Sequence, residues 1–508
     1  MSEVAQYEVA IVGGGPVGMG LAIDLGQRGV KVIVIERYPR PQQVPKGQNL
    51  TQRSVEHFQA WHCEEELRAA RITPRGVVNG GLTCYGSLLS GYYYDWLPRE
   101  QVRPFYNTDV ERLPQYATEA VLRQRAVEIP NIVIKYGQKA AALDQDADQV
   151  HLTFEDTTTA ARETVTASWL VGCDGSRSFV REHASITQTK KDHDRKMVLL
   201  VFKSSELHDL LSVLPERSFY NALNPDFGGY WQFLGRVDLG TEWFFHAPVP
   251  LGTTKDNFDF EAFLHKAVGQ SFPLDLTYVG FWDLRFAQAD TYRNERILLA
   301  GDAAHSHPPY GGYGINLGFE DARNLGWKLA AHIKGWAGDG LVSSYNEERH
   351  PVFASTARDF IENFIVQDRK FLETHNPDGD EPAFRKAWET RNLDASEVFN
   401  FEPNYEGSSV ISPLSGMTPS AIGSHQMTAK TGHHLAPQPL NDNRMSFEAI
   451  NQEGYTILTT AVKRAAAQTL VAQAQKAGVP MTLINSLGDA AVAAYETDFI
   501  IMRPDQFV

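Results

Sequence analysis

Residues 7–36 read YEVAIVGGGPVGMGLAIDLGQRGVKVIVIE, and this stretch decides the fold class. Two apolar runs, 7–12 and 30–36, enclose a glycine-rich turn and a helical pattern over 18–28, which together predict a β-turn-α-β unit. Both runs are rich in Val and Ile, as is typical of strands buried on both faces of a parallel sheet. We therefore expect an α/β fold built on a parallel sheet.

The glycines of this turn follow the G-x-G-x-x-G pattern. Glycine there permits a tight turn and lets a pyrophosphate approach the helix N-terminus, where unpaired N–H groups and the helix dipole favour anions. Glu36 ends the second strand about 20 residues later, where an acid can accept hydrogen bonds from ribose hydroxyls. The unit therefore predicts dinucleotide binding rather than a purely structural turn, without distinguishing NAD from FAD. The predicted contacts are Gly13, Gly15, Pro16, Val17, Gly18, Glu36 and Arg37.

The composition is that of an ordinary globular protein. Of 508 residues, 43% are apolar and 21% are charged, and the formal net charge is -15. This acidic balance disfavours nucleic acid, whose phosphates need cations, and an anionic membrane surface. No apolar run approaches the ~20 residues of a membrane span, and the acidic N-terminus does not resemble a signal peptide. Cys63, Cys84 and Cys173 form no CxxC, so we expect a reducing, cytoplasmic location.

The rest of the chain changes in character twice. Residues 179–289 contain alternating, aromatic-rich segments, which predict an antiparallel sheet with large side chains on one face. Those rings can serve as core packing or can line an apolar ligand cavity. Residues 372–415 are rich in Asn, Asp, Glu, Pro and Ser, and we expect a connector there. The tail from about 430 predicts a small α/β unit, with strands over 455–460 and 480–485, a helix over 462–477 and a final strand pair.

Two further motifs follow predicted strands. Residues 170–178 (LVGCDGSRS) place Asp174 in a turn ahead of a helix, and alone they indicate a turn with an N-cap. Residues 296–316 (RILLAGDAAHSHPPYGGYGIN) place Asp302 just after a strand, where its carboxylate can accept hydrogen bonds from a polyol chain. The Pro- and Gly-rich segment lets the backbone lie against a flat ring. The N-terminus of the next helix would stabilise negative charge on that ring by roughly 0.3–2 kcal/mol.

These three motifs, in this order, resemble the class A FAD-dependent aromatic hydroxylases, the para-hydroxybenzoate and phenol hydroxylase superfamily. The resemblance covers nearly the whole chain and extends to PKGQNLTQRSVE at 45–56 and DARNLGWKLA at 321–330. The chain looks most like phenol, dichlorophenol and polyketide hydroxylases, which carry a C-terminal thioredoxin-like domain. GHHLAPQPLNDNRMSF at 432–447 and the final MRPDQFV are similar to that domain. Because no Cys follows Cys173, the domain cannot exchange dithiols.

The resemblance implies three kinds of domain. They are a Rossmann-like FAD-binding domain of the GR2 type, an inserted antiparallel-sheet substrate domain, and a thioredoxin-like domain that lacks CxxC. The implied division is an FAD-binding domain at 1–178 and 290–375, a substrate-binding domain at 76–105 and 179–289, a connector at 376–425 and the thioredoxin-like domain at 426–508.

The resemblance also implies cofactor contacts. Gln115 would contact the ribityl or ring region of FAD, Asp302 would hold the ribityl chain, and Asp174 would lie near the nicotinamide and flavin. Lys46 stands where the family often has Arg near the pyrophosphate, which keeps the charge but loses the fork geometry. Glu295 stands where the family usually has Gly. The remaining implied contacts are Gln48, Gly301, Pro309, Gly312, Gly314, Ile315 and Asn316.

The implied reaction is hydroxylation of a phenolic or other electron-rich aromatic substrate. NADH or NADPH reduces FAD, O2 adds to give a C4a-hydroperoxyflavin, and its distal OH passes to the ring. No second G-x-G-x-x-G occurs, so we expect NAD(P)H to bind transiently. A base or hydrogen-bond acceptor should touch the substrate hydroxyl. The candidates, each with ordinary surface or sheet pairing as the alternative, are His246, Asp283, Arg285, Tyr230 and Pro308.

Other interpretations stay open. An oxidase, a dehydrogenase, a halogenase or a flavin-bound sensor would share the FAD motifs, although the W-x-W-x-I-P segment of flavin-dependent halogenases is absent. No metal is expected, because His305 and His307 lie in a Pro-rich loop with no Cys or carboxylate cluster beside them. The C-terminal domain makes a homodimer plausible.

Overall fold

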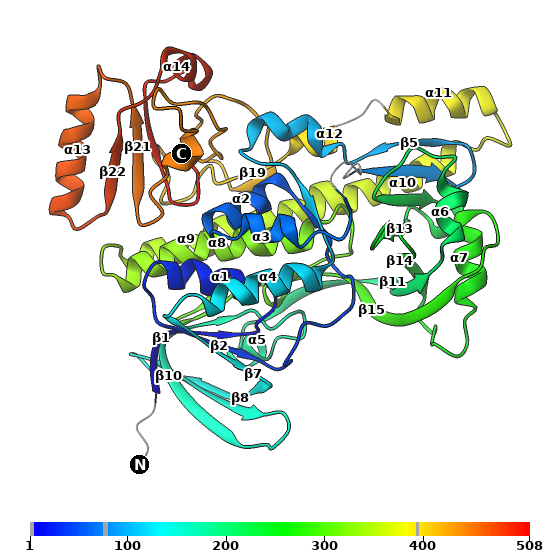
Figure 1. The fold of residues 1–508 in the computed structure, drawn as a ribbon, viewed down its shortest axis with the longest axis horizontal. Helices are drawn as coiled ribbons and strands as arrows, with labels where there is room; N and C mark the ends of the chain where they lie inside the picture. Colours follow the sequence, from blue (N-terminus) through cyan, green and yellow to red (C-terminus); the bar gives the residue numbers. More distant parts are fainter. Residues whose placement is uncertain (1–4, 75–79, 393–395) are drawn as a thin grey trace.

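The computed structural model describes residues 5–74, 80–392 and 396–508. Residues 76–79 of the expected substrate-binding segment and 393–395 of the expected connector therefore lie outside the described residues. Figure 1 shows a central sheet with helices along it, a second sheet at one end, and a small C-terminal sheet with its own helices. None of the helices in the described ranges combines the length and the apolar character that a bilayer span requires.

The predicted β-turn-α-β unit lies at the centre of the first sheet. The strands of this sheet are β1 (Ala5–Val12), β2 (Val32–Glu36), β7 (Ile132–Tyr136), β8 (Gln138–Gln145), β9 (Val150–Asp156), β10 (Arg162–Gly172), β16 (Arg293–Asn294) and β17 (Ile297–Leu299). Their order is β16-β17-β10-β1-β2-β7, with β9 and β8 added beside β10. β1 pairs in parallel with β2 and β10, and every residue of β2 is buried. The predicted parallel sheet is confirmed.

Helices pack along this sheet and lead into the site. α1 (Pro16–Gln27) begins directly after the glycine turn with Pro at its first position, where the missing N–H removes no helical hydrogen bond. Figure 1 shows α1 and α8 side by side above β1 and β2, with α4 next to α1. The other helices of this part are α2 (Gln52–Ala60), α3 (Glu64–Ala69), α4 (Gln115–Val127), α5 (Phe179–His183), α8 (Tyr313–Ile333) and α9 (Asp339–Ser355). The short strands β3 (Asn49–Leu50) and β6 (Glu111–Arg112) pair beside α2.

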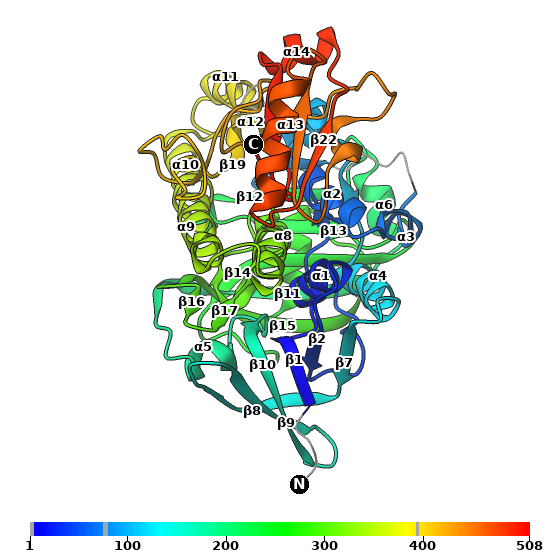
Figure 2. The same ribbon diagram turned by 90° about the vertical axis from the view of Figure 1, so that its left-hand side faces the viewer.

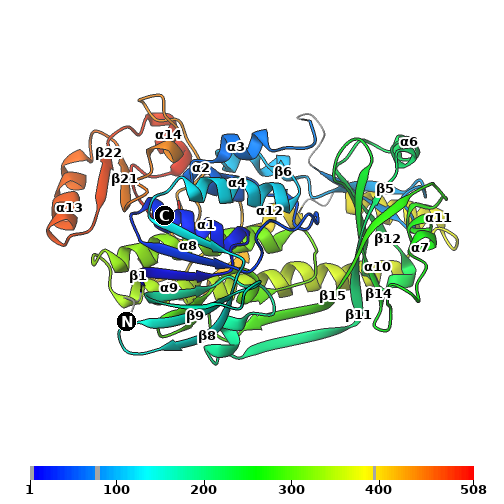
Figure 3. The ribbon, with the colours of Figure 1, turned by 60° about the horizontal axis from the view of Figure 1, so that its bottom comes forward.

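The expected antiparallel sheet is present and takes in a hairpin from earlier in the chain. Its strands are β4 (Gly81–Tyr85), β5 (Tyr93–Trp96), β11 (Gln188–Lys203), β12 (Phe219–Leu223), β13 (Gln232–Arg236), β14 (Glu242–Pro250), β15 (Asp275–Ala289) and β18 (His305–Ser306). Their order is β18-β15-β11-β14-β13-β12-β4-β5, with β4 and β12 parallel and the remaining pairs antiparallel. Figure 3 shows β11 and β15 as long strands that run from beside the first sheet into the second. The helices α6 (Glu206–Leu211) and α7 (Phe260–Val268) lie beside this sheet.

The expected connector carries more regular structure than its composition indicates. Within it lie α11 (Glu381–Asn392), α12 (Ser396–Asn400), β19 (Phe401–Asn404) and β20 (Ser420–Ile422), and α10 (Asn363–Thr374) precedes it. Phe384 and Trp388 are buried on α11, four residues apart, against Tyr85 and Tyr94. Two apolar side chains on one helical face are enough to anchor a helix whose remaining residues are polar.

The C-terminal part has the expected alternation of strands and helices. Its sheet has the order β22-β21-β23, and Figure 2 places it at the end of the molecule opposite the N-terminus. Its elements are β21 (Tyr455–Thr459), α13 (Arg464–Lys476), β22 (Met481–Ile484), α14 (Asp489–Tyr495) and β23 (Phe499–Met502). The expected final strand pair is wrong. After β23 the chain turns, because Arg503 and Asp505 form buried ion pairs and hydrogen bonds with Glu348 and Trp327.

Candidate active site

One cavity joins the two large sheets. Its volume is about 820 Å³, and it extends from the first glycine turn, past the start of α8, to the aromatic face of the second sheet. Motifs that are far apart in the sequence therefore meet at one site. The predicted residues that line it are Gly13, Gly15, Pro16, Val17, Glu36, Arg37, Lys46, Gln48, Gln115, Asp174, His246, Asp283, Arg285, Asp302, Pro309, Gly312, Gly314 and Ile315.

The glycine turn forms one end of the cavity. Gly13 has φ of 105°, and a Cβ atom there would lie 2.3 Å from the carbonyl oxygen of Cys173 at the end of β10. Gly15 differs, because a Cβ atom there would meet nothing within 4 Å. Its surroundings are open to a ligand. The first turn of α1 contains no acidic residue, so its N–H groups are available to an anion.

Glu36 ends β2 as predicted and is tied to the glycine turn. Its carboxylate accepts hydrogen bonds from the N–H groups of Gly14 (2.6 Å) and Tyr38 (2.7 Å). A carboxylate has about four lone-pair sites. Two of them therefore remain for ligand hydroxyls, and the two backbone bonds hold the carboxylate in place.

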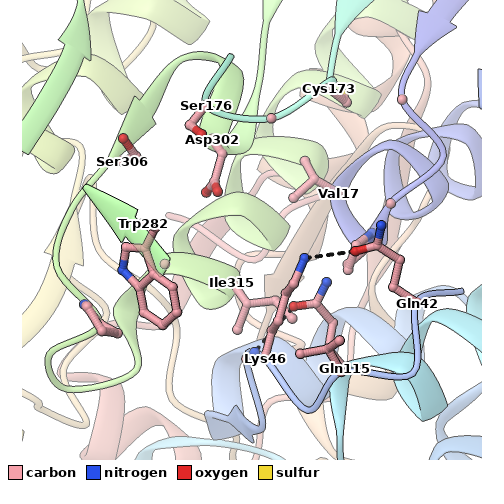
Figure 4. A pocket seen from close by; sticks show the side chains of 18 of the residues that line it. Val17, Gln42, Lys46, Gln115, Cys173, Ser176, Trp282, Asp302, Ser306 and Ile315 are labelled. Carbon is pink, nitrogen blue, oxygen red and sulfur yellow. Dashed lines mark hydrogen bonds between the residues drawn. The ribbon is translucent and has the colours of Figure 1, made fainter. Parts of the chain in front are cut away.

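Gln115 and Lys46 line the cavity beside Ile315, in the first turn of α8 (Figure 4). The Gly47 N–H donates to Gln115 Oε1 (3.2 Å), and Gln115 Nε2 donates to Glu119 Oε1 (2.8 Å). These two bonds orient the amide. Lys46 Nζ donates to Gln42 Oε1 (3.2 Å), and Figure 4 shows its side chain beside Gln115. The lysine therefore brings a positive charge to the cavity wall.

Asp302 presents an unused carboxylate to the cavity. It follows β17 in a short turn (Gly301–Ala303), and Figure 4 shows it pointing into the space between Val17 and Trp282. It accepts no hydrogen bond from the described part of the chain, and burial raises its pKa, with Lys46 opposing that effect. A carboxylate held without donors in a walled cavity gains from a ligand that supplies hydroxyl groups.

Asp174 serves the protein itself. Its carboxylate accepts hydrogen bonds from the hydroxyl of Ser178 (2.5 Å) and the N–H of Val180 (3.1 Å). Burial raises the pKa of Asp174, and the Ser178 bond opposes that shift. The residue lines the cavity and also fixes the turn that leads into α5. The reading of this motif as a turn with an N-cap is therefore confirmed, since Ser178 caps α5.

The loop before α8 needs glycine at two consecutive positions. Gly311 and Gly312 have φ of 63° and 68°, in the left-handed region that favours glycine. Asn316, one turn into α8, accepts from the Thr51 N–H (2.9 Å) and donates to the carbonyls of Gly312 (2.6 Å) and Asn49 (2.9 Å). Asn316 does not line the cavity. It positions the loop that does, which corrects its expected direct contact.

The far end of the cavity is an aromatic chamber on the face of the second sheet. Neighbouring rings touch edge to face or tilted, as between Trp96 and Phe219 (5.7 Å between centroids) and between Phe233 and Phe244 (5.4 Å). We call this region the aromatic chamber. Its residues are Trp96, Leu97, Leu199, Phe219, Phe233, Phe244, His246, Gly280 and Trp282. Some of the predicted aromatic residues therefore line a cavity rather than fill a core.

His246 is the polar side chain set among these rings. It lies opposite Phe233 in the pairing of β13 with β14, and its ring centroid is 5.3 Å from Phe244 and 5.0 Å from Trp282. Its Nδ1 is buried and has no hydrogen-bond partner among the residues that the structure describes. Burial lowers the pKa of His246 to about 3, so the ring is neutral at physiological pH.

Asp283 and Arg285 form a pair at the rim of the cavity. Arg285 donates to the Asp283 carboxylate at 2.8 Å, and their side chains are 32% and 56% exposed, respectively. They alternate with Trp282 and Leu284 along β15, so the strand directs them away from the face that carries Trp282. The ordinary pairing that the sequence left open for these residues is therefore present.

Four other expected contacts lie outside the cavity lining. Tyr230 is buried in the apolar cluster that also contains Trp231 and the chamber residues Trp96 and Phe219, and it precedes β13, the strand that carries Phe233. Pro308 is buried and accepts a hydrogen bond from His307 Nδ1 (2.5 Å). Gly18 and Gly301 stand behind the wall and allow the close approach of Gly13 and Val17. These residues shape the cavity without facing it.

The two histidines of the loop have partners within the protein. His305 Nε2 donates to Asp321 Oδ2 (2.7 Å), and Arg349 donates to the other oxygen of the same carboxylate (2.7 Å). Although burial opposes its ionisation, these two groups hold the pKa of Asp321 below its ordinary value. Among residues 5–74, 80–392 and 396–508, no group of three His, Cys, Asp or Glu residues could hold a metal ion.

Several lining residues were not predicted. Trp96 ends β5 and Leu97 follows it. The resemblance places residues 76–105 in the substrate-binding domain, but no motif marks these two side chains. Tyr278, Gly280 and Trp282 lie within an aromatic segment that was recognised, but alternation alone does not say which face meets the cavity. Glycine is required at position 280, because a Cβ there would lie 2.5 Å from the Tyr278 hydroxyl.

The residues present fit FAD. The glycine turn is open at Gly15, the first turn of α1 is free of acid, and Asp302 offers a carboxylate that the protein does not use. The loop at Gly311 and Gly312 is narrow enough for a flat ring to approach the backbone. The cavity then continues beyond that loop into the aromatic chamber, which leaves room for a second molecule.

Comparison with known proteins supports this assignment. A family model described as an FAD binding domain matches residues 6–359. A rifampicin monooxygenase of Streptomyces venezuelae is 33% identical over 359 residues, which cover 68% of each chain. A tetracenomycin B2 monooxygenase-dioxygenase of Streptomyces olivaceus is 28% identical over 541 residues, which cover 99% of this chain and 94% of that one.

A solved structure has the same fold. The flavin-dependent monooxygenase PieE, solved in complex with FAD and substrate, superposes with a TM-score of 0.84 at 22% identity, over 99% of this chain and 95% of that one. The predicted relationship to FAD-dependent monooxygenases is confirmed by the family match and by the fold. The chain therefore belongs to the FAD binding domain family and has the fold of the FAD-dependent monooxygenases.

Proposed function

We propose that this protein is a single-component, FAD- and NAD(P)H-dependent monooxygenase that hydroxylates a phenolic or other electron-rich aromatic substrate. The observation that carries the proposal is the single cavity of about 820 Å³ with a dinucleotide-binding turn at one end and an aromatic chamber at the other. A cofactor and an aromatic substrate can share one walled space there. The names of the relatives, which include monooxygenases of polycyclic compounds, support it.

The residues that would hold FAD follow the cavity in order. The Gly13–Gly15 turn and the N-terminus of α1 would bind the pyrophosphate, and Glu36 would accept from the ribose. Asp302 would accept from the ribityl chain, and the backbone around Gly312 would lie against the ring. When bound, FAD would supply the hydride acceptor and the ring that reacts with O2. The remaining contacts we propose are Arg37, Lys46, Gln48, Gln115, Asp174, Pro309, Gly314 and Ile315.

The chain itself would stabilise charge, shape the pocket and exclude water from it. The N-terminus of α8 would stabilise negative charge on a reduced ring by roughly 0.3–2 kcal/mol, because its first turn has no acidic residue. The packed rings of the aromatic chamber would keep water from the reacting atoms. Phosphate groups of NADH or NADPH would meet cations at the cavity wall, where Arg177 and Lys190 are exposed. His246, Asp283 and Arg285 remain the candidates for contact with substrate.

The domain division is part of the same proposal. We assign residues 1–178 and 290–375 to a Rossmann-like FAD-binding domain of the GR2 type, because the first sheet draws its strands from these segments. The second sheet supports a substrate-binding domain at 76–105 and 179–289. The order β22-β21-β23, with parallel β21–β22 and antiparallel β21–β23 pairing, supports a thioredoxin-like fold at 426–508. We also propose that this domain contributes a homodimer contact and that the protein is located in the cytoplasm.

The experiment is a panel of phenols, benzoates and polycyclic quinols incubated with the purified protein, FAD and NAD(P)H. Substrate-stimulated NAD(P)H oxidation that matches the amount of hydroxylated product would support the proposal. Hydrogen peroxide without a hydroxylated product would indicate an oxidase. No stimulation by any compound, with FAD firmly bound, would favour a flavin-bound sensor.

A further inference from the structure

The aromatic chamber can discriminate between ligands by their charge and polar groups as well as by their shape. Five of its nine residues are Trp or Phe, and Leu97, Leu199 and Gly280 add apolar surface. Within the described residues, none of the chamber's side chains is Asp, Glu, Lys or Arg. Charged groups occur at its rim, where Asp283 and Arg285 neutralise each other at 2.8 Å. A charge carried into the chamber would therefore lose water without gaining a counter-charge.

The polar exception is His246, and its position is set by the sheet. It shares one row across the strands with Phe233, Leu199 and Gly280. Leu199 lies between His246 and Gly280 in this row, and the imidazole borders the cavity. His246 makes no side-chain hydrogen bond with the described protein, and its Nδ1 is buried. The nitrogen that can meet a ligand is therefore Nε2.

From these observations we infer that the aromatic chamber binds an uncharged aromatic ring and that His246 hydrogen-bonds an oxygen substituent on it. This selects phenols over both arene carboxylates and unsubstituted arenes. The inference rests on the proposed function only in taking the chamber as the substrate site. A neutral imidazole can accept from a phenol hydroxyl or, as the other tautomer, donate to a quinone or ketone oxygen.

His246 orients the substrate in this account and does not deprotonate it. Burial lowers the pKa of its imidazolium to about 3, whereas a phenol such as the tyrosine side chain has a pKa of about 10. Transfer of the phenol proton to the imidazole is therefore unfavourable by the difference between these two pKa values. His246 is therefore a specificity-determining residue, and its loss should change which ring binds more than how flavin is held.

The test uses binding, without NAD(P)H, to the purified full-length protein in buffer that contains FAD. The probes are 1-naphthol, naphthalene and 1-naphthoate, which share one ring system, and the measurement is isothermal titration calorimetry. We expect naphthol to bind about tenfold more tightly than naphthalene, which corresponds to about 1.4 kcal/mol. We expect naphthoate to bind at least about 100-fold more weakly than naphthol.

Three variants separate the hydrogen bond from the shape of the chamber. In His246→Phe the preference for naphthol over naphthalene should fall to about one, while His246→Asn should restore part of it through its amide. Phe244→Leu, on the same face of β14, should weaken both neutral probes and keep their ratio. If His246→Phe fails to fold, the naphthol-to-naphthalene binding ratio of His246→Asn can still be compared with that of Phe244→Leu.

Three outcomes would overturn the inference. These are naphthoate binding as tightly as naphthol, an unchanged naphthol-to-naphthalene ratio in His246→Phe, and an absence of saturable binding by all probes. Because no turnover is measured, failure of the proposed function looks different. In that case the binding selectivity would persist while no compound stimulated NAD(P)H oxidation coupled to product.

Discussion

Replacing Asp302 by Ala should weaken FAD binding without unfolding the protein. The Asp302 carboxylate accepts no hydrogen bond from the described chain, so its removal leaves no protein donor unpaired. A hydrogen bond from a ligand hydroxyl to a charged acceptor contributes roughly 1.5–3 kcal/mol. This corresponds to an increase in Kd of about 10- to 150-fold. Because the Asp302 side chain is exposed to solvent, a ligand hydroxyl replaces water at this carboxylate, and the lower end of this range is expected.

The assay is a titration of apo-protein with FAD, followed by quenching of flavin fluorescence, together with urea unfolding of the apo-protein. Asp302→Asn should fall between wild type and Ala, because the amide keeps one acceptor oxygen without the charge. Gln48→Ala is the comparison, since Gln48 is also a proposed contact but its amide already donates to the carbonyl of Pro45 (3.3 Å), and we expect its Kd to rise less than that of Asp302→Ala. A Kd for Asp302→Ala within twofold of wild type would refute the role of this carboxylate.

Three other changes have defined outcomes. Gly13→Ala should abolish FAD binding and lower the free energy of unfolding by more than about 2 kcal/mol, because its Cβ would lie 2.3 Å from the Cys173 carbonyl oxygen; retained flavin in a gel-filtered sample would contradict this. Burial raises the pKa of Glu397 to about 7, so the folded state binds the proton of this carboxyl more tightly than the unfolded state does. The free energy of unfolding should therefore fall as pH rises from about 4.5 to 7, by at most about 3 kcal/mol. Urea unfolding of Glu397→Gln should lack this component, and an identical pH slope in both proteins would count against it. Glu295→Gly should raise the free energy of unfolding by about 0.5 kcal/mol, since φ is 51° at this position and the strain of a left-handed residue exceeds the extra entropy that glycine loses; a lower melting temperature would speak against this balance.

Local motifs made the cofactor end of the cavity predictable. Gly13 and Gly15 act through the backbone conformation of a single turn, and Asp302 lies next to the strand that places it. In both cases the residue type and its distance from a strand determine its position. The same holds for Glu295, because a position where relatives carry Gly has positive φ here.

The substrate end depends on pairings that no short stretch encodes. His246 and Tyr230 come from equally aromatic segments, yet His246 lines the chamber and Tyr230 is buried in the apolar cluster without lining the cavity. Tyr230 precedes β13, so the register that places Phe233 opposite His246 does not position it. Trp96 reaches the chamber through a parallel pairing of β4 with β12, which joins segments more than a hundred residues apart along the printed sequence. The Asn316 amide is bonded to Thr51 and Gly312, a positioning role that the motif in the sequence does not reveal.

The central claim is that oxygen reaches an aromatic ring inside the shared cavity. The most direct measurement is mass spectrometry of the product formed from NAD(P)H, FAD, a phenol that the protein binds, and 18O2. The account predicts a hydroxylated product that carries one labelled oxygen atom, in proportion to the NAD(P)H consumed. Unlabelled product, or labelled hydrogen peroxide with the phenol returned unchanged, would contradict it.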